Sequence, residues 1–190
     1  QGVASRFCLP KTAWPPTYVF RQTTARLPWL LIGMLGGIGN SMILGNFDST
    51  FAAHPEMALY IPLIGGTGGN VGTQSSALVV QGLANSSLNA ENTFKQVLKE
   101  SVVALINATI ISMLVYIYNF IRFGATATVS YSVSISLFAV VMFASIFGTL
   151  VPMTLEKLKI DPAIATGPFI SITNDIIGML MYMGITVLLS

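Results

Sequence analysis

The sequence predicts an all-α membrane protein with five transmembrane helices in each chain. Only 8% of its residues are charged and 53% are hydrophobic, which gives a mean hydropathy of +0.74. A soluble domain carries about 25% charged residues, so this chain has too little polar surface for a globule in water. Five apolar runs are each long enough to cross roughly 30 Å of hydrocarbon, which takes about 20 helical residues.

The five runs are separated by short segments rich in polar residues, glycine or proline. Pro28 suits the N-terminus of the first helix, and Asp161 followed by Pro162 predicts a capped start for the last. Either Ser87 or Asn89 is suited to cap the third. The predicted spans are 27–50, 57–82, 95–121, 129–155 and 162–189.

The basic residues predict the orientation of these spans. Eight of the nine Lys and Arg residues fall in the N-terminal stretch and in the second and fourth connections. The ninth, Arg122, is alone in the connections on the other side. Because cytoplasmic loops carry the excess of positive charge, we expect a cytoplasmic N-terminus and an external C-terminus, in a cell membrane.

Residues 1–26 are polar and contain several prolines, so we expect a cytoplasmic juxtamembrane linker followed by a pore domain over 27–190. The chain begins at Gln1, which suggests a fragment of a longer protein or a processed one. A net charge of +2 and the lack of a basic stripe argue against a nucleic-acid partner. The single cysteine excludes an intrachain disulfide. We expect no enzyme, because the predicted spans carry no Ser/His, Cys/His or paired-aspartate arrangement.

Asp175 is the strongest candidate for function. It lies near the middle of the run 162–189, roughly 20 Å from either end at about 1.5 Å per residue. An ionised Asp there costs on the order of 3 kcal/mol to insert, and acids inside membranes usually mark ion pathways. The other six acids lie near predicted helix ends, with Glu100 the nearest rival. The alternative is an Asp that only joins helices by hydrogen bonds.

The neighbours of Asp175 favour a cation. Ser171 and Gly178 share its helix face, and Gly167 lies near that face. Pro168 frees the carbonyl of the preceding turn, and free carbonyls at membrane depth are tolerated where they line a cavity. One carboxylate per chain suits Mg²⁺, which keeps most of its waters, and a symmetric dimer would bring two copies of Asp175 to one axis.

A second group of polar and small residues, "GGTGGNVGTQSS", lies at 65–76 inside the second run. Its glycines permit close helix packing. Packing alone does not explain the polar residues among them, of which Asn70 and Gln74 share a helix face. The pattern favours a pore wall or a broken helix. It is no phosphate-binding loop, because it lacks the GK[ST] ending and no strand precedes it.

Two long motifs resemble the transmembrane domain of the MgtE family of magnesium channels. They are "PLIGGTGGNVGTQSSALVVQGLA" at 62–84 and "DPAIATGPFISITNDIIGMLMYMGI" at 161–185. The resemblance covers about 27–189. It implies a homodimer in the lipid bilayer, with a pore near the dimer axis lined by the second and fifth helices. The expected pore-lining residues are Gly68, Gly69, Asn70, Gln74, Gly167, Pro168, Asn174 and Gly178.

The resemblance also implies a set of metal contacts. Asp175 matches the pore aspartate that holds hydrated Mg²⁺ with its copy in the second chain, and Ser171 matches a carbonyl facing that ion. Asp161 matches a cytoplasmic-side acid that takes part in closing the pore when regulatory Mg²⁺ binds. The alternative is that Asp161 only caps the N-terminus of its helix. Its family partners lie in a plug helix and in N-terminal and CBS domains, and residues 11–26 are expected to be the end of that plug helix. Gly167 departs from the family pattern, which has Asn before the proline.

Three function classes stay open on the sequence. The first is a passive Mg²⁺ channel. The second is a secondary transporter in which Asp175 couples Na⁺ or H⁺ to Mg²⁺ flux, because midplane acids also suit transporters. The third is a membrane scaffold without transport, for which replacing Asp175 would leave every flux unchanged.

Overall fold

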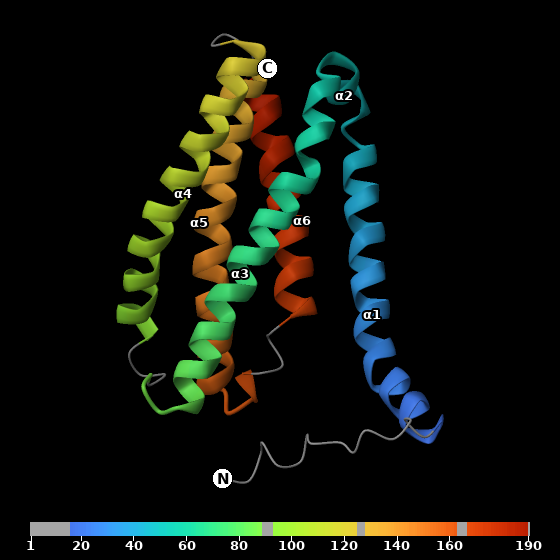
Figure 1. The fold of residues 1–190 in the computed structure, drawn as a ribbon, viewed down its shortest axis with the longest axis vertical. Coiled ribbons are helices and arrows are strands. Elements are labelled where there is room, and N and C mark those ends of the chain that lie inside the picture. Colours follow the sequence, from blue (N-terminus) through green and yellow to red (C-terminus); the bar gives the residue numbers. More distant parts are fainter. Residues whose placement is uncertain (1–15, 89–92, 125–127, 163–166, 190) are drawn as a thin grey trace.

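The computed structural model describes residues 16–88, 93–124, 128–162 and 167–189. These residues form helices that run side by side, joined by short connections (Figure 1). No strand occurs within the described ranges. The helices are α1 (Pro16–Gly45), α2 (Asp48–Ala53), the 3₁₀ helix η2 (Pro55–Tyr60), α3 (Ile61–Ala84), α4 (Thr93–Phe123), α5 (Thr128–Lys157) and α6 (Pro168–Leu189).

Four of the described helices are long and apolar enough to cross a membrane: α4, α5, α6 and the part of α1 over Val19–Gly45. This confirms an all-helical, multi-pass arrangement. The second predicted run is also one helix, the 24-residue α3, whose length is roughly 36 Å. This helix is not among the four that are apolar enough by hydropathy, because glycines and polar side chains interrupt its apolar residues. The count of five spans therefore stays a prediction.

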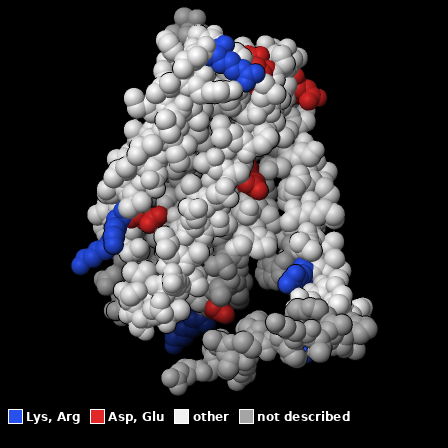
Figure 2. Space-filling view, in the orientation of Figure 1, with Lys and Arg blue, Asp and Glu red and all other residues white. Residues whose placement is uncertain are grey.

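Helix α5 lies at the centre of the bundle and packs against α3, α4 and α6. Its buried face carries Val133, Leu137 and Val140, which join Tyr182 and Met183 of α6 in the apolar core. Helices α1 and α4 are peripheral and expose large apolar side chains, for example 67% of Leu30 and 79% of Ile121. Most of the face in Figure 2 is likewise uncharged. Such a surface suits contact with lipid rather than water.

The first helix does not begin where the sequence predicts. α1 starts at Pro16, so Pro28 lies inside the helix instead of at its N-terminus. A proline in a helix interior removes one backbone hydrogen bond and bends the axis, and α1 runs at an angle in its first turns (Figure 1). α1 therefore includes the second part of the expected linker 1–26, and residues 1–15 lie outside the described residues.

The last helix also begins later than predicted, at Pro168 rather than Pro162. The reason is local, because Gly167 has φ of +83°, a left-handed conformation that a continuous helix cannot contain. Pro168 then takes the first helical position, where its missing N–H costs no hydrogen bond. Asp161 consequently does not cap this helix. Asp175 lies seven residues after Pro168, about 10 Å along the axis.

The glycine-rich segment of α3 is a continuous helix and not a broken one. Two other helices pack tightly against it. A Cβ on Gly148 of α5 would overlap the carbonyl of Gly72, and a Cβ on Gly72 would overlap the Asn174 amide of α6. A Cβ on Gly68 would lie 2.8 Å from Cγ1 of Val140. The glycines thus let three helix backbones approach closely, as small residues do in membranes.

Buried hydrogen bonds hold the connection between α1 and α3 to the bundle. The Tyr182 hydroxyl of α6 donates to the Met57 carbonyl of η2 over 2.9 Å. The Tyr60 hydroxyl donates to the Asn119 side chain of α4. These bonds anchor η2, from which α3 begins.

Glu100 of α4 forms a second polar junction inside the bundle. Its Oε1 accepts a hydrogen bond of 2.8 Å from the hydroxyl of Ser75 in α3 and one of 2.7 Å from that of Ser145 in α5. The two serine oxygens are 3.1 Å apart. One carboxylate therefore ties three helices together.

Candidate cation site

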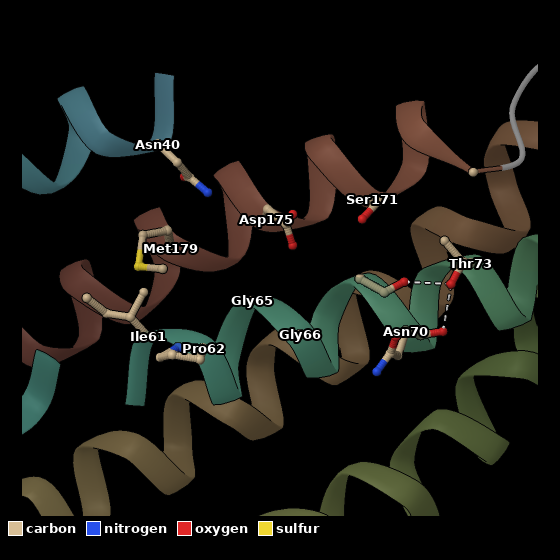
Figure 3. A pocket seen from close by; sticks show the side chains of 12 residues that line it. Asn40, Ile61, Pro62, Gly65, Gly66, Asn70, Thr73, Ser171, Asp175 and Met179 are labelled. Carbon is tan, nitrogen blue, oxygen red and sulfur yellow. Dashed lines mark hydrogen bonds between the residues drawn. The ribbon is translucent and has the colours of Figure 1, made fainter. Parts of the chain in front are cut away.

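A cavity of about 520 Å³ opens between α1, α3 and α6 (Figure 3). Helix α3 forms one wall, in which the glycine-rich segment leaves space because three of its lining positions have no side chain. Helix α6 forms the opposite wall. The lining residues are Asn40, Ile61, Pro62, Gly65, Gly66, Gly69, Asn70, Thr73, Gly167, Ser171, Asp175 and Met179.

Asp175 is the acidic residue of this cavity. Its carboxylate faces the turn of α3 that carries Gly65 (Figure 3). A Cβ on Gly65 would lie 3.7 Å from its Oδ1, and one on Gly69 would lie 3.4 Å from it. The described residues give Asp175 no hydrogen bond and no ion pair. Its negative charge is therefore available to a ligand inside the cavity.

Ser171 lies one helical turn before Asp175, on the same wall. Its hydroxyl oxygen would be 3.2 Å from a Cβ on Gly69, so the hydroxyl also faces the cavity. Its backbone N–H donates to the Gly167 carbonyl over 3.0 Å. Across the cavity, the Thr73 hydroxyl donates to the carbonyls of Gly69 and Asn70 over 2.8 and 3.1 Å. The polar groups around Asp175 thus come from both walls.

This arrangement suits a cation that keeps its water. The described residues contain no group of three Asp, Glu, His or Cys side chains that could hold a bare metal ion. Six waters occupy about 180 Å³ at roughly 30 Å³ each, which is well within the cavity volume. A carboxylate and a hydroxyl can accept hydrogen bonds from the water ligands, and Mg²⁺ is usually held through one or two carboxylates with its waters.

The structure brings five of the predicted site residues together at this cavity. They are Gly69, Asn70, Gly167, Ser171 and Asp175.

The other predicted residues lie elsewhere. Gly68 and Gly178 are buried against Val140 of α5. Asn174 is buried against Gly72, and its two amide atoms have no partner among the described residues. The remaining three are exposed and do not line the cavity: Gln74 on α3, Pro168 at the start of α6, and Asp161 in the connection before it. Residues 163–166, between Asp161 and the cavity, lie outside the described residues.

Sequence reasoning did not assign Asn40 to this site. Asn40 belongs to α1 and lines the cavity opposite α3 (Figure 3). An Asn in an apolar run is the available signal, but by itself it equally indicates a hydrogen bond between helices. Which of the two applies depends on how α1 packs, and the sequence does not show that.

Four helices long and apolar enough to cross a membrane, together with a carboxylate that has no partner among the described residues, define a multi-pass membrane protein with a candidate cation site. Comparison with known proteins narrows this class. The family model "MgtE: Divalent cation transporter" matches residues 61–185, which cover α3, α4, α5 and most of α6. The chain belongs to the MgtE family.

Three relatives carry the name Magnesium transporter MgtE. The protein from Bacillus subtilis is 34% identical over 160 residues, which are 84% of this chain and 35% of the relative. Those from Thermus thermophilus and Enterococcus faecalis are 33% and 29% identical over 165 residues, 87% of this chain and 36% of each relative. The chain thus spans about a third of the length of these relatives.

Proposed function

We propose that this chain is the pore-forming part of a Mg²⁺ channel, which conducts hydrated Mg²⁺ into the cytoplasm past Asp175. The observation that carries the proposal is the Asp175 carboxylate, which has no partner within the described part of the chain and lies on a cavity large enough for a hydrated ion. The family description as a divalent cation transporter and the names of the relatives support Mg²⁺ as the cargo. Ser171 adds a hydroxyl and a carbonyl on the same wall.

The proposal includes a homodimer. A single carboxylate halves the positive charge of Mg²⁺, whereas the Asp175 residues of two chains on a common axis would neutralise it. The N-terminus is cytoplasmic and the C-terminus external, as the distribution of basic residues favours. The resemblance to the family adds cytoplasmic N-terminal and CBS domains, the end of the plug helix at 11–26, and a regulatory Mg²⁺ near Asp161.

The alternative is a transporter that couples Mg²⁺ to Na⁺ or H⁺. An acid inside a membrane bundle binds a proton or Na⁺ as readily as it attracts Mg²⁺. Passive flux requires no counter-ion gradient, and coupled flux stops without one. This difference separates the two mechanisms.

The test is Mg²⁺ influx into proteoliposomes, without a Na⁺ or pH gradient, for the intact protein and its Asp175→Asn variant. The magnitude follows from electrostatics. A divalent ion about 4 Å from a carboxylate gains about 2 kcal/mol even at the dielectric constant of water. Loss of that attraction lowers binding at the site by about thirtyfold or more. We therefore expect influx by the variant to fall by at least about thirtyfold at low Mg²⁺.

Asp48→Asn is the matched control, because Asp48 is exposed on α2 and away from the cavity. Influx that requires a Na⁺ or H⁺ gradient would replace the channel by the coupled transporter. Equal influx in the Asp175→Asn and wild-type proteins would show that the ion path lies elsewhere.

A further inference from the structure

Asn40 is a polar residue of α1 for which the described residues offer no hydrogen bond. Its Oδ1 is buried and has no partner. A buried acceptor without a partner costs about 1–3 kcal/mol, so such an atom calls for an explanation. The rest of α1 does not supply one, because this helix is peripheral and mainly exposes apolar side chains.

The packing of α1 explains why Asn40 lies at the cavity. Gly36 precedes it by one helical turn, so the two residues share a face. A Cβ on Gly36 would overlap the side chain of Ile172 in α6, so the missing side chain lets the two helices approach closely. This close contact between α1 and α6 places the Asn40 amide at the cavity that Asp175 lines (Figure 3).

The chemistry of a primary amide suits the contents of such a cavity. The amide can rotate by half a turn about its last side-chain bond, a torsion with two broad minima, and this exchanges Oδ1 and Nδ2. Oδ1 then faces the cavity and can accept a hydrogen bond from water. The water ligands of a divalent cation are strong donors, and they supply the partner that Oδ1 lacks in its enclosed position.

We propose that Asn40 is a further cation-binding residue, whose amide oxygen accepts hydrogen bonds from the water ligands of a divalent cation held at Asp175. The proposal rests on the proposed function and extends it to a third helix. The charge of Asp175 attracts any cation, whereas a neutral amide forms hydrogen bonds with the ligands around the ion. Asn40 therefore contributes to the preference for an ion that keeps its water ligands.

The test compares Asn40→Leu with wild type in proteoliposomes of the intact protein. Leu is close to Asn in size and inserts well into membranes, but it accepts no hydrogen bond. Asn107→Leu is the matched control, because Asn107 is exposed on α4 and does not line the cavity. We expect Asn40→Leu to lower Mg²⁺ influx roughly tenfold, as loss of a hydrogen bond to an ion's water shell predicts, and the control to leave it unchanged.

A second measurement uses hexaamminecobalt(III), an ion whose six ammonia ligands donate hydrogen bonds and do not exchange. Its block of Mg²⁺ influx should weaken in Asn40→Leu by a similar factor, whereas Asn40→Asp should keep influx and strengthen the block. If Asn40 only packs against α6, Asn40→Asp keeps its shape and leaves the block by hexaamminecobalt(III) unchanged, and this overturns the proposal.

Failure of this proposal and failure of the proposed function give different results. If both Leu variants match wild type in influx and block while Asp175→Asn abolishes influx, the role of Asn40 is refuted and the channel stands. If Asp175→Asn retains full influx, the proposed function itself falls, and with it the role of Asn40. If Asn40→Leu misfolds, it loses its monodisperse peak in size-exclusion chromatography. The influx and block measured for Asn40→Asp then decide whether Asn40 binds the cation.

Discussion

The contact between Gly68 and Val140 predicts a measurable cost for a single added methyl group. A Cβ on Gly68 would lie 2.8 Å from Cγ1 of Val140, whereas ordinary contact begins at 3.4 Å, so one of them must move by about 0.6 Å. Val140 is 1% exposed, and a valine in a helix has essentially one rotamer. The helices must therefore separate, and overpacking of this kind costs about 1–3 kcal/mol.

The assay is thermal unfolding of the detergent-solubilised protein, followed by loss of the monodisperse peak in size-exclusion chromatography. For 190 residues, 1 kcal/mol corresponds to roughly 2–4 °C in Tm. Gly68→Ala should therefore lower Tm by about 2–12 °C. Gly66→Ala is the matched control in the same helix, because nothing lies within 4 Å of its Cβ position. Alanine there should be neutral or stabilising by up to about 1 kcal/mol.

A double-mutant cycle tests the physical reason. Val140→Ala removes the methyl group that the new Cβ meets, so Gly68→Ala should cost less in that background, with a coupling of about 0.5–3 kcal/mol. Equal Tm values for Gly68→Ala and Gly66→Ala, or strictly additive effects in the cycle, would refute the reasoning. Gly68 would then face open space, as a pore-lining position does.

Two further predictions concern the cavity wall and the polar junction. Gly69→Leu should abolish Mg²⁺ influx, because a Cβ there already lies 3.2 Å from the Ser171 hydroxyl oxygen and 3.4 Å from Oδ1 of Asp175, and the rest of the side chain would occupy the space beside that carboxylate. Influx near the wild-type rate would exclude this cavity from the ion path. Glu100→Ala should lower stability by roughly 1.5–3 kcal/mol in the same unfolding assay, because two buried serine hydroxyls lose their acceptor, whereas Glu100→Gln keeps an acceptor oxygen and most of the stability. A Gln variant as unstable as the Ala variant would show that the junction needs the charge.

The boundaries of the helices are predicted best where hydropathy alone defines them. The third and fourth predicted runs, 95–121 and 129–155, agree closely with α4 and α5. The ends at prolines are predicted less well. Pro28 lies inside α1 because a helix tolerates one kink, and α6 starts at Pro168 because Gly167 adopts a positive φ. The backbone conformation of Gly167 therefore decides where α6 starts.

Membership of the candidate site can be predicted only in part. Gly68 and Gly69 are neighbours in the sequence, but one faces α5 and the other faces the cavity. Successive residues of a helix differ by about 100°, so the rotation of α3 about its axis decides which of them reaches the cavity. That rotation depends on contacts with α5 and α6 that no local pattern encodes.

The sequence by itself determined the class of the protein and indicated a candidate functional residue. Low charge and long apolar runs require a membrane bundle, and a lone acid deep in the last run singles out Asp175 as the candidate for function. Only the tertiary structure decided that no other described residue pairs with this carboxylate, that glycines of α3 leave the space opposite it, and that Asn40 reaches the same cavity. The physical reason is that insertion energy is a property of each segment, whereas a cavity depends on how closely separate helices pack.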